Sequence, residues 1–221
     1  MKLITTQLVH RVLEPAHASA GPHPTLIMLH GRGADEQDLL GIAPALDPRL
    51  LIVSARAPFP FGPGGGYTWY DVGEVGAPQP EMFASSYERL LAFVEEVRAG
   101  YPVDTGRLFL YGFSMGSVMS LALGLTHPEL FRGIVANSGY VPEGTHLTLR
   151  WDGLGATAFF IAHGTFDPII PVAFARRARE LFASSNAPVS YAEYPMGHEI
   201  SERSLRDTVD WMATLLDGSA S

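Results

Sequence analysis

The chain has 221 residues, of which 47% are hydrophobic and 17% are charged, so it can bury a sizeable core. The formal net charge of -8, with acidic and basic residues mixed along the chain, argues against nucleic acid and anionic membranes as partners. The absence of cysteine excludes disulfides, a thiol nucleophile and cysteine metal sites.

The N-terminal stretch is interrupted by polar residues before any apolar run of signal-peptide length, and no stretch approaches the roughly 20 apolar residues of a membrane span. We therefore expect a cytoplasmic protein without stable membrane insertion. No linker, repeat or low-complexity segment divides the chain, so we expect a single domain over residues 1–221.

Apolar runs of strand length alternate with segments of helical spacing along most of the chain. The expected strands cover residues 3–12, 25–29, 50–54, 108–111, 133–137, 156–162 and 189–194. Five helices are expected. The first follows Asp35, which would cap it, the second opens at Ser85 or Ser86, and the third runs on from Met115. The last two cover residues 172–183 and 201–217, and Gly218 ends the last one. This alternation predicts an α/β fold, an open and mostly parallel sheet with helices on both faces.

A long loop follows the strand predicted at residues 50–54 and extends to about residue 80. Five aromatic residues lie in it among glycines and prolines, namely Phe59, Phe61, Tyr67, Trp69 and Tyr70. Long loops inside compact domains are usually functional or disordered, and we interpret this one as an ordered wall of a pocket. The alternative is that the aromatic side chains simply cover the edge of the sheet.

The pentapeptide from Gly112 to Gly116 lies where a predicted strand turns into a predicted helix, with Ser114 at its centre. A serine on such a sharp turn needs small residues two positions to either side, because the backbone is strained and passes close to its neighbours. The pattern predicts that Ser114 is a nucleophile. An ordinary glycine-rich turn is the alternative that the pentapeptide by itself leaves open.

A serine nucleophile needs a base within hydrogen-bond reach and a third group that orients the base. His198 follows the last predicted strand and is the candidate base, and Asp167, which follows the preceding strand, is the candidate third group. The chain order serine, aspartate, histidine is that of the α/β-hydrolases. The rival carboxylates, which are expected to lie in solvated turns, are those of Asp71, Asp104 and Asp152. The other two histidines at strand ends, His30 and His163, are interpreted as loop anchors.

An acyl-transfer mechanism also needs two donors for the developing oxyanion. The backbone N–H of Met115 directly follows the nucleophile, and the backbone N–H of Arg32 lies in the loop after an early strand, so we predict that these two groups form the oxyanion hole. The segment from His30 to Gly33 lacks the lysine of a phosphate-binding loop. No metal or nucleotide motif is present, and we expect no cofactor and no metal.

The motifs LHGRGADEQDLL, YGFSMG, HGTFDPIIP and YPMGHEI, with TWYD at the end of the long loop, come in one order along nearly the whole chain. Together they resemble the phospholipase/carboxylesterase family of α/β-hydrolases, which includes acyl-protein thioesterases and small bacterial carboxylesterases. The resemblance implies an α/β-hydrolase fold without a large cap domain. It also implies that the triad consists of Ser114, Asp167 and His198. The backbone N–H groups of Arg32 and Met115 would form the oxyanion hole. The substrate-binding residues beside the acyl pocket would be Trp69, Tyr70 and Asp71.

The family commonly has glutamine after the nucleophile, and this chain has Met115, so any contact of a glutamine side chain with the loop is expected to be lost. The resemblance implies a serine esterase whose partner is a small-molecule ester. Thioesters and lysophospholipids, cleaved by the same triad, are the alternatives, and a non-catalytic ligand-binding protein of the same fold is a further one. The sequence leaves the oligomeric state open between a monomer and a homodimer.

Overall fold

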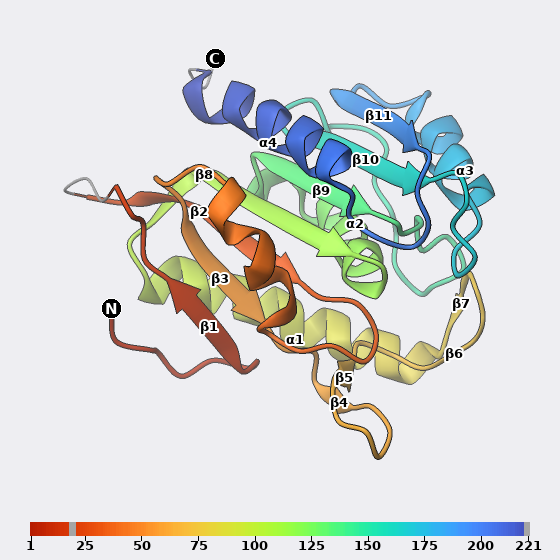
Figure 1. The fold of residues 1–221 in the computed structure, drawn as a ribbon, viewed down its shortest axis with the longest axis horizontal. Coiled ribbons are helices and arrows are strands. Elements are labelled where there is room, and N and C mark those ends of the chain that lie inside the picture. Colours follow the sequence, from red (N-terminus) through yellow and green to blue (C-terminus); the bar gives the residue numbers. More distant parts are fainter. Residues whose placement is uncertain (18–20, 219–221) are drawn as a thin grey trace.

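The computed structural model describes residues 1–17 and 21–218, so residues 18–20 and 219–221 of the expected domain lie outside it. A seven-stranded sheet with the order β1-β3-β2-β8-β9-β10-β11 forms its centre (Figure 1). The strands are β1 (His10–Leu13), β2 (His23–Leu29), β3 (Leu51–Ala55), β8 (Val103–Phe113), β9 (Gly133–Asn137), β10 (Ala158–Gly164) and β11 (Val189–Tyr194). Only β1 pairs antiparallel, with β3, and the other neighbours pair in parallel, which confirms the mostly parallel sheet.

Helices cover both faces of this sheet, as the alternation predicted. They are the 3₁₀ helices η1 (Asp38–Ala45) and η2 (Pro128–Leu130), and the α-helices α1 (Pro80–Gly100), α2 (Met115–Thr126), α3 (Ala173–Phe182) and α4 (Glu202–Asp217). The first three α-helices share a buried apolar cluster on one face, and η1 and α4 share a second cluster on the other. In Figure 1, α4 lies in front of the sheet and α1 lies behind it.

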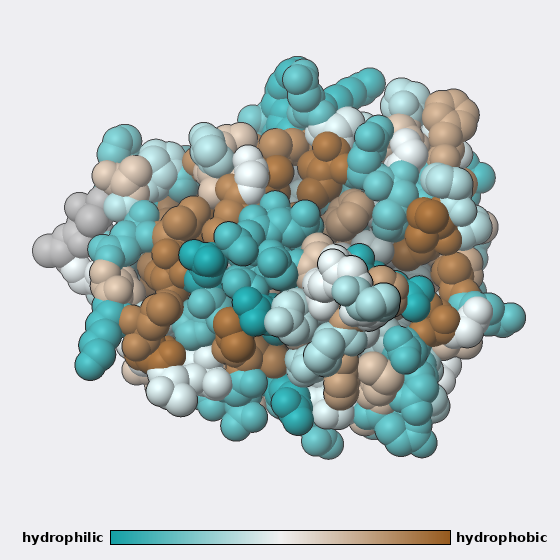
Figure 2. All heavy atoms as spheres, turned by 60° about the horizontal axis from the view of Figure 1, so that its bottom comes forward, coloured by the Kyte–Doolittle hydropathy of each residue, from teal (hydrophilic) through white to brown (hydrophobic). Residues whose placement is uncertain are grey.

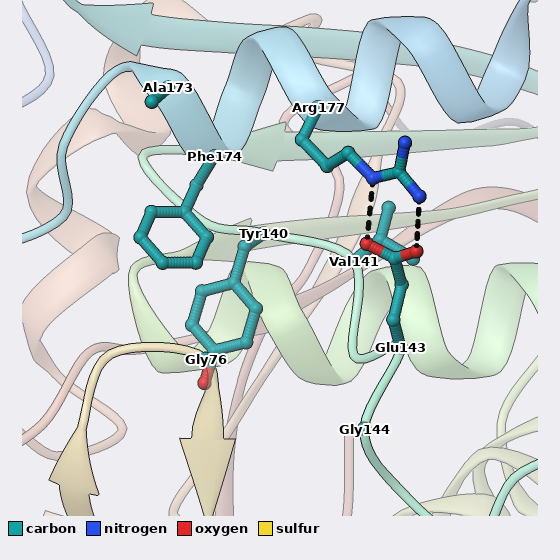
Figure 3. Close-up of a pocket in the computed structure, with 8 residues that line it drawn as sticks. All are labelled: Gly76, Tyr140, Val141, Glu143, Gly144, Ala173, Phe174 and Arg177. Carbon is teal, nitrogen blue, oxygen red and sulfur yellow. Dashed lines mark hydrogen bonds and ion pairs between the residues drawn. The ribbon is translucent and has the colours of Figure 1, made fainter.

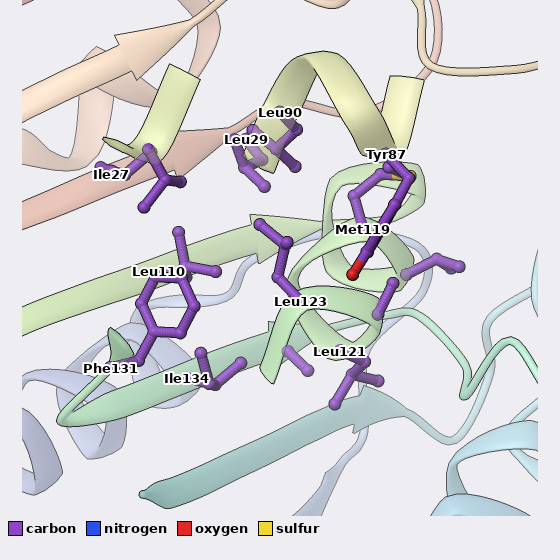
Figure 4. Close-up of a cluster of buried hydrophobic side chains, with 14 of the residues drawn as sticks. Ile27, Leu29, Tyr87, Leu90, Leu110, Met119, Leu121, Leu123, Phe131 and Ile134 are labelled. Atoms are coloured by element: carbon purple, nitrogen blue, oxygen red, sulfur yellow. The ribbon is translucent and has the colours of Figure 1, made fainter. Parts of the chain in front are cut away.

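Alternating side chains of the central strands feed the two apolar clusters. In β2, Ile27 and Leu29 belong to the cluster with α2, while Leu26 and Met28 belong to the cluster with η1 and α4. Figure 4 shows the first cluster, in which Met119, Leu121 and Leu123 of α2 gather with side chains of the sheet and with Leu90 of α1. Because α2 is packed from both sides, its N-terminus is held firmly at the carboxyl edge of the sheet.

Three differences from the prediction concern β1, the helix after Asp35 and α1; in addition, β8 begins at Val103 and not at residue 108. The first strand begins at His10 and not at residue 3, because β1 pairs only over the four positions where β3 runs beside it. Asp35 does not cap a helix: its carboxylate accepts the N–H of Gln37 at 2.8 Å, and a 3₁₀ helix containing Pro44 follows. These differences depend on pairing and turn geometry, which local composition does not reveal.

The third difference is the start of α1, which begins at Pro80 and not at Ser85 or Ser86. The Gln79 side chain accepts the N–H of Met82 and caps the helix, and a proline fits its first turn because the missing N–H has no partner there anyway. The long loop after β3 ends at about residue 80, as predicted.

That loop folds into two small hairpins, β4 (Phe59–Pro60) with β5 (Tyr67–Thr68), and β6 (Val72–Glu74) with β7 (Ala77–Pro78). No large inserted domain covers the sheet within residues 21–218. No helix in the described part of the chain is long and apolar enough to cross a membrane. On the face drawn in Figure 2, hydrophobic residues gather at several separate places between hydrophilic ones.

Candidate active site

Ser114 lies at the junction of β8 and α2 with a backbone φ of 55° and ψ of -120°, a region that a non-glycine residue rarely adopts. The flanking glycines make this turn possible. A Cβ atom on Gly116 would collide with the Leu29 carbonyl at the end of β2, and one on Gly112 would collide with the backbone of Gly116. The strained turn therefore holds the hydroxyl of Ser114 at the carboxyl edge of the sheet.

The three residues of the predicted triad lie within hydrogen-bonding distance of one another. His198 Nε2 is 2.9 Å from Ser114 Oγ, and His198 Nδ1 is 2.7 Å from Asp167 Oδ2. A carboxylate only accepts, so Nδ1–H donates to Asp167 and Nε2 is free to accept the serine proton. The imidazole is partly buried, with 16% of its side chain exposed, and its ring packs beside that of Phe113.

The side chain of Asp167 is fully buried and held by the backbone that follows it. Its Oδ1 accepts the N–H groups of Ile169 and Ile170 at 2.8 and 2.9 Å, which leaves Oδ2 for His198. The neighbouring His163 is also fully buried, and its Nε2–H donates to the Ile170 carbonyl at 2.8 Å. Burial lowers the pKa of His163, so this ring stays neutral and anchors the loop, as predicted.

His30 anchors the loop after β2 in the same way. Its Nδ1–H donates to the Gly31 carbonyl at 2.6 Å, and its Nε2 accepts the N–H of Ala57 at 3.0 Å. The indole N–H of Trp69 donates to the His30 carbonyl at 2.9 Å. The interpretation of His30 as a loop anchor is confirmed, and the buried indole fixes the start of the same loop, directly after β2.

The loop that carries Arg32 is pinned by the first hairpin. The Gly33 N–H donates to the Tyr67 carbonyl and the Tyr67 N–H donates to the Ala34 carbonyl, both at 2.8 Å. The Arg32 guanidinium lies over the ring of Phe61, 4.6 Å from its centre. The N–H of Met115 lies in the first turn of α2, where backbone N–H groups have no partner within the helix.

A cavity of about 90 Å³ opens beside Ser114. Its walls come from five segments of the chain and are mostly apolar: Arg32, Tyr70, Val72, Val75, Ser114, Met115, Tyr140, Ile169 and Ile170. Of the three predicted substrate-binding residues, only Tyr70 lines it. Trp69 is buried behind the wall and Asp71 is exposed to solvent. The aromatic loop thus contributes both a pocket wall and buried packing.

Sequence reasoning missed several of these wall residues, namely Val72, Val75, Tyr140, Ile169 and Ile170. They are apolar side chains in short hairpin strands or irregular segments, where no periodicity marks them. The one available signal was position, because the last two come within three residues after Asp167 and Tyr140 follows a strand by three residues. In the described residues no group of three or more metal-binding side chains is present.

The methionine after the nucleophile does contact the long loop. Met115 is buried, and its Sδ lies 3.4 Å from the hydroxyl of Thr68, which also donates to the Tyr70 carbonyl at 2.7 Å. The loss of a glutamine contact stays a prediction, and in this chain Met115 supplies a buried sulfur contact to the loop and an apolar side chain to the cavity wall.

An ion pair between the buried Glu36 and the partly exposed Arg56 ties the Arg32 loop to the end of β3. Arg56 donates to both carboxylate oxygens of Glu36, at 2.6 and 2.9 Å, and these hydrogen bonds lower the pKa of Glu36. We expect Glu36→Gln to lower the unfolding free energy at pH 7 by about 2 kcal/mol, because bonds to charged groups contribute about that much. Thermal and denaturant unfolding would measure it.

The stabilisation from Glu36 has a defined pH dependence. Because its folded-state pKa is lowered, the contribution is complete above the unfolded-state pKa and is lost as the pH falls through the folded-state pKa. The stability gap between wild type and Glu36→Gln is therefore expected to close in acid. The exposed pair of Glu95 and Arg98 offers a control, since Glu95→Gln is expected to change little. A gap that is constant down to acid pH would contradict this role.

This fold, with a serine and a histidine hydrogen-bonded at the carboxyl edge of its sheet, places the chain among the α/β-hydrolases. A family model described as Phospholipase/Carboxylesterase matches residues 11–216, and the chain belongs to this family. The resemblance seen in the motifs is confirmed, and with it the class of carboxylic ester hydrolases.

Individual relatives agree with the family match. Acyl-protein thioesterase 1 of Debaryomyces hansenii is 29% identical over 167 residues, which cover 71% of this chain and 72% of that protein. The carboxylesterase of Bacillus cereus has a TM-score of 0.82 at 24% identity, covering 94% of both chains. That of Mesorhizobium loti has a TM-score of 0.83 at 21% identity, covering 96% of this chain and 97% of its own. These two structures share the fold.

Proposed function

We propose that this protein hydrolyses carboxylic esters of small acyl substrates through an acyl-enzyme on Ser114. The observation that carries the proposal is the continuous hydrogen-bonded path from Ser114 Oγ through both nitrogens of His198 to Asp167. A serine hydroxyl is a weak nucleophile, and this arrangement supplies both the base and the group that fixes its tautomer.

In the first half of the reaction, His198 Nε2 takes the hydroxyl proton while Ser114 Oγ attacks the acyl carbonyl carbon. Asp167 keeps the proton on Nδ1 and stabilises the imidazolium that forms. The backbone N–H groups of Arg32 and Met115 are proposed to stabilise the oxyanion. The imidazolium then protonates the leaving alcohol, whose bond to the acyl carbon breaks.

In the second half, the neutral imidazole takes a proton from water as the water oxygen attacks the acyl-enzyme. The resulting imidazolium returns this proton to Ser114 Oγ as the acyl–oxygen bond breaks. The carboxylic acid leaves and the free enzyme is restored. The side chains at this centre supply every proton transfer.

Thioesters are the second candidate substrates, because the similar Debaryomyces protein carries the name of an acyl-protein thioesterase. Lysophospholipids are a further alternative, since phospholipase is part of the family's description. The same nucleophile and base would act on each. The cavity beside Ser114 is small and mostly apolar, which favours a small-molecule ester as the substrate. A cytoplasmic location and a single domain over residues 1–221 stay predictions.

Two measurements test the proposed function. Mass spectrometry after treatment with a fluorophosphonate should find one adduct, on Ser114, and the Ser184→Ala variant, which lacks an exposed serine, should be labelled equally. Rates for an ester, a thioester and an amide with the same butyryl group should then rank the ester or the thioester above the amide. Absence of labelling together with turnover of none of the three would favour a non-catalytic ligand-binding protein.

A further inference from the structure

A second hollow adjoins the cavity beside Ser114, which we call the catalytic cavity. This second hollow, the outer pocket, has a volume of about 240 Å³. Figure 3 shows the rings of Tyr140 and Phe174 beside each other in it, with Arg177 and Glu143 paired at its far side. Of the described residues, only Tyr140 lines both hollows.

Three segments of the chain contribute residues to both hollows. In the second hairpin, Val75 lines the catalytic cavity and the next residue, Gly76, lines the outer pocket. After Asp167, Ile170 lines the catalytic cavity, and Phe174 lines the outer pocket one helical turn further on. The third segment carries Tyr140. The hollows therefore lie side by side, and the side chain of Tyr140 is the wall between them.

Tyr140 is held firmly in this position. Only 4% of it is exposed, and its ring centre lies 5.5 Å from that of Phe174. Its hydroxyl lies 3.3 Å from that of the buried Tyr70. Burial raises the pKa of the Tyr140 hydroxyl, which stays protonated at neutral pH. The wall is thus a neutral aromatic ring tied at its tip.

The backbone before Tyr140 is shaped to place this wall over the nucleophile. Ser138 directly follows β9 and has a φ of 55°, one of two non-glycine residues with positive φ among those described; the other is Ser114. At Gly139, a Cβ atom would collide with the side chain of Ser117 in the first turn of α2. Strain of this kind is usually maintained where a side chain must be positioned for function.

We propose that Tyr140 limits the length of the acyl chain that this enzyme accepts, an inference that rests on the proposed function. The catalytic cavity, at about 90 Å³, has less than half the volume of the outer pocket, at about 240 Å³. We therefore expect the catalytic cavity to take short acyl groups such as butyryl. A longer chain would need the outer pocket, which Tyr140 closes off from Ser114.

The test compares p-nitrophenyl esters of two to twelve acyl carbons with wild type and Tyr140→Ala. For the wild type, kcat/KM is expected to rise to the butyrate and to be about tenfold lower for the octanoate. In Tyr140→Ala the two hollows merge, and the ratio of octanoate to butyrate is expected to rise about tenfold or more. The reason is that each methylene buried in an apolar site contributes about fourfold.

Tyr140→Phe is the matched control, because it loses the hydroxyl contact with Tyr70 but keeps the ring that forms the wall. Its chain-length preference is expected to follow the wild type. A Tyr140→Ala enzyme that is folded, labelled on Ser114 and unchanged in chain-length preference would overturn the proposal. A wild type that prefers the octanoate would overturn it as well.

Two further readouts separate the possible failures. If Tyr140→Ala does not fold, the proposal can still be tested on the wild type alone. The rate at which alkyl fluorophosphonates label Ser114 is expected to fall beyond about four alkyl carbons. A rate that keeps rising with chain length would refute the role of Tyr140. Failure of the proposed function itself would differ from both, since Ser114 would then not be labelled and no ester of any length would be hydrolysed.

Discussion

Replacing Ser114 with alanine is expected to lower kcat for ester hydrolysis by about a millionfold, because no other group at the site can form the acyl-enzyme. His198 lies 2.9 Å from the hydroxyl that the substitution removes, so the base would be left without its proton donor. The proposed oxyanion donors at Arg32 and Met115 remain, and they account for the residual rate above that of water.

The measurement is single-turnover and steady-state hydrolysis of p-nitrophenyl butyrate, with the concentration of folded enzyme determined from its absorbance for wild type and variants alike. Ser184→Ala is the matched control. This serine is exposed just after the C-terminal end of α3, and its loss should leave kcat unchanged. A fall of less than about tenfold in Ser114→Ala would remove Ser114 from the mechanism.

The Asp167→Asn variant is expected to lower kcat by about ten thousandfold at neutral pH, through the tautomer of the base. Oδ1 of Asp167 accepts the backbone N–H groups of Ile169 and Ile170, so the amide oxygen of asparagine must take that position. Its NH₂ group then faces His198 Nδ1, which has to accept. The ring proton moves to Nε2, and the base can no longer take the proton of Ser114.

The tautomer itself can be observed by ¹⁵N NMR of the His198 ring, which should show protonated Nδ1 in the wild type and protonated Nε2 in Asp167→Asn. Asp152→Asn, which changes an exposed carboxylate, is the control and should alter neither the rate nor the ring. Circular dichroism would verify that both variants fold. If Asp167→Asn kept more than a tenth of the wild-type rate, Asp167 would not be the group that orients the base.

Prediction from the sequence was most reliable where local composition determines the structure. The buried strand β9 and the start of the helix α2 agree with their apolar patterns. The start of β1 was predicted seven residues too early, because its length depends on where β3 runs beside it. The start of α1 was predicted five residues too late, since the cap is supplied by Gln79, a residue type with a weaker preference for that position.

For the site, motif order predicted which side chains would meet, and the hydrogen bonds among Ser114, His198 and Asp167 agree with that expectation. Their mechanistic roles stay predictions for the variants above to test. Glycine spacing also pointed to the strained turn, because the positions two residues to either side of Ser114 leave no room for a Cβ atom. These features are local, and a single stretch of sequence is enough to express them.

The shape of the cavity could not be read in this way. Tyr140 and Val75 carry no motif or periodicity, and they meet at Ser114 only because the second hairpin and the segment after β9 converge over the carboxyl edge of the sheet. The sequence by itself determined the fold class and the family and predicted the reacting side chains, since these depend on local patterns and on strand order. Only the tertiary structure decided the size of the site and the wall that limits it, because packing between distant segments sets both.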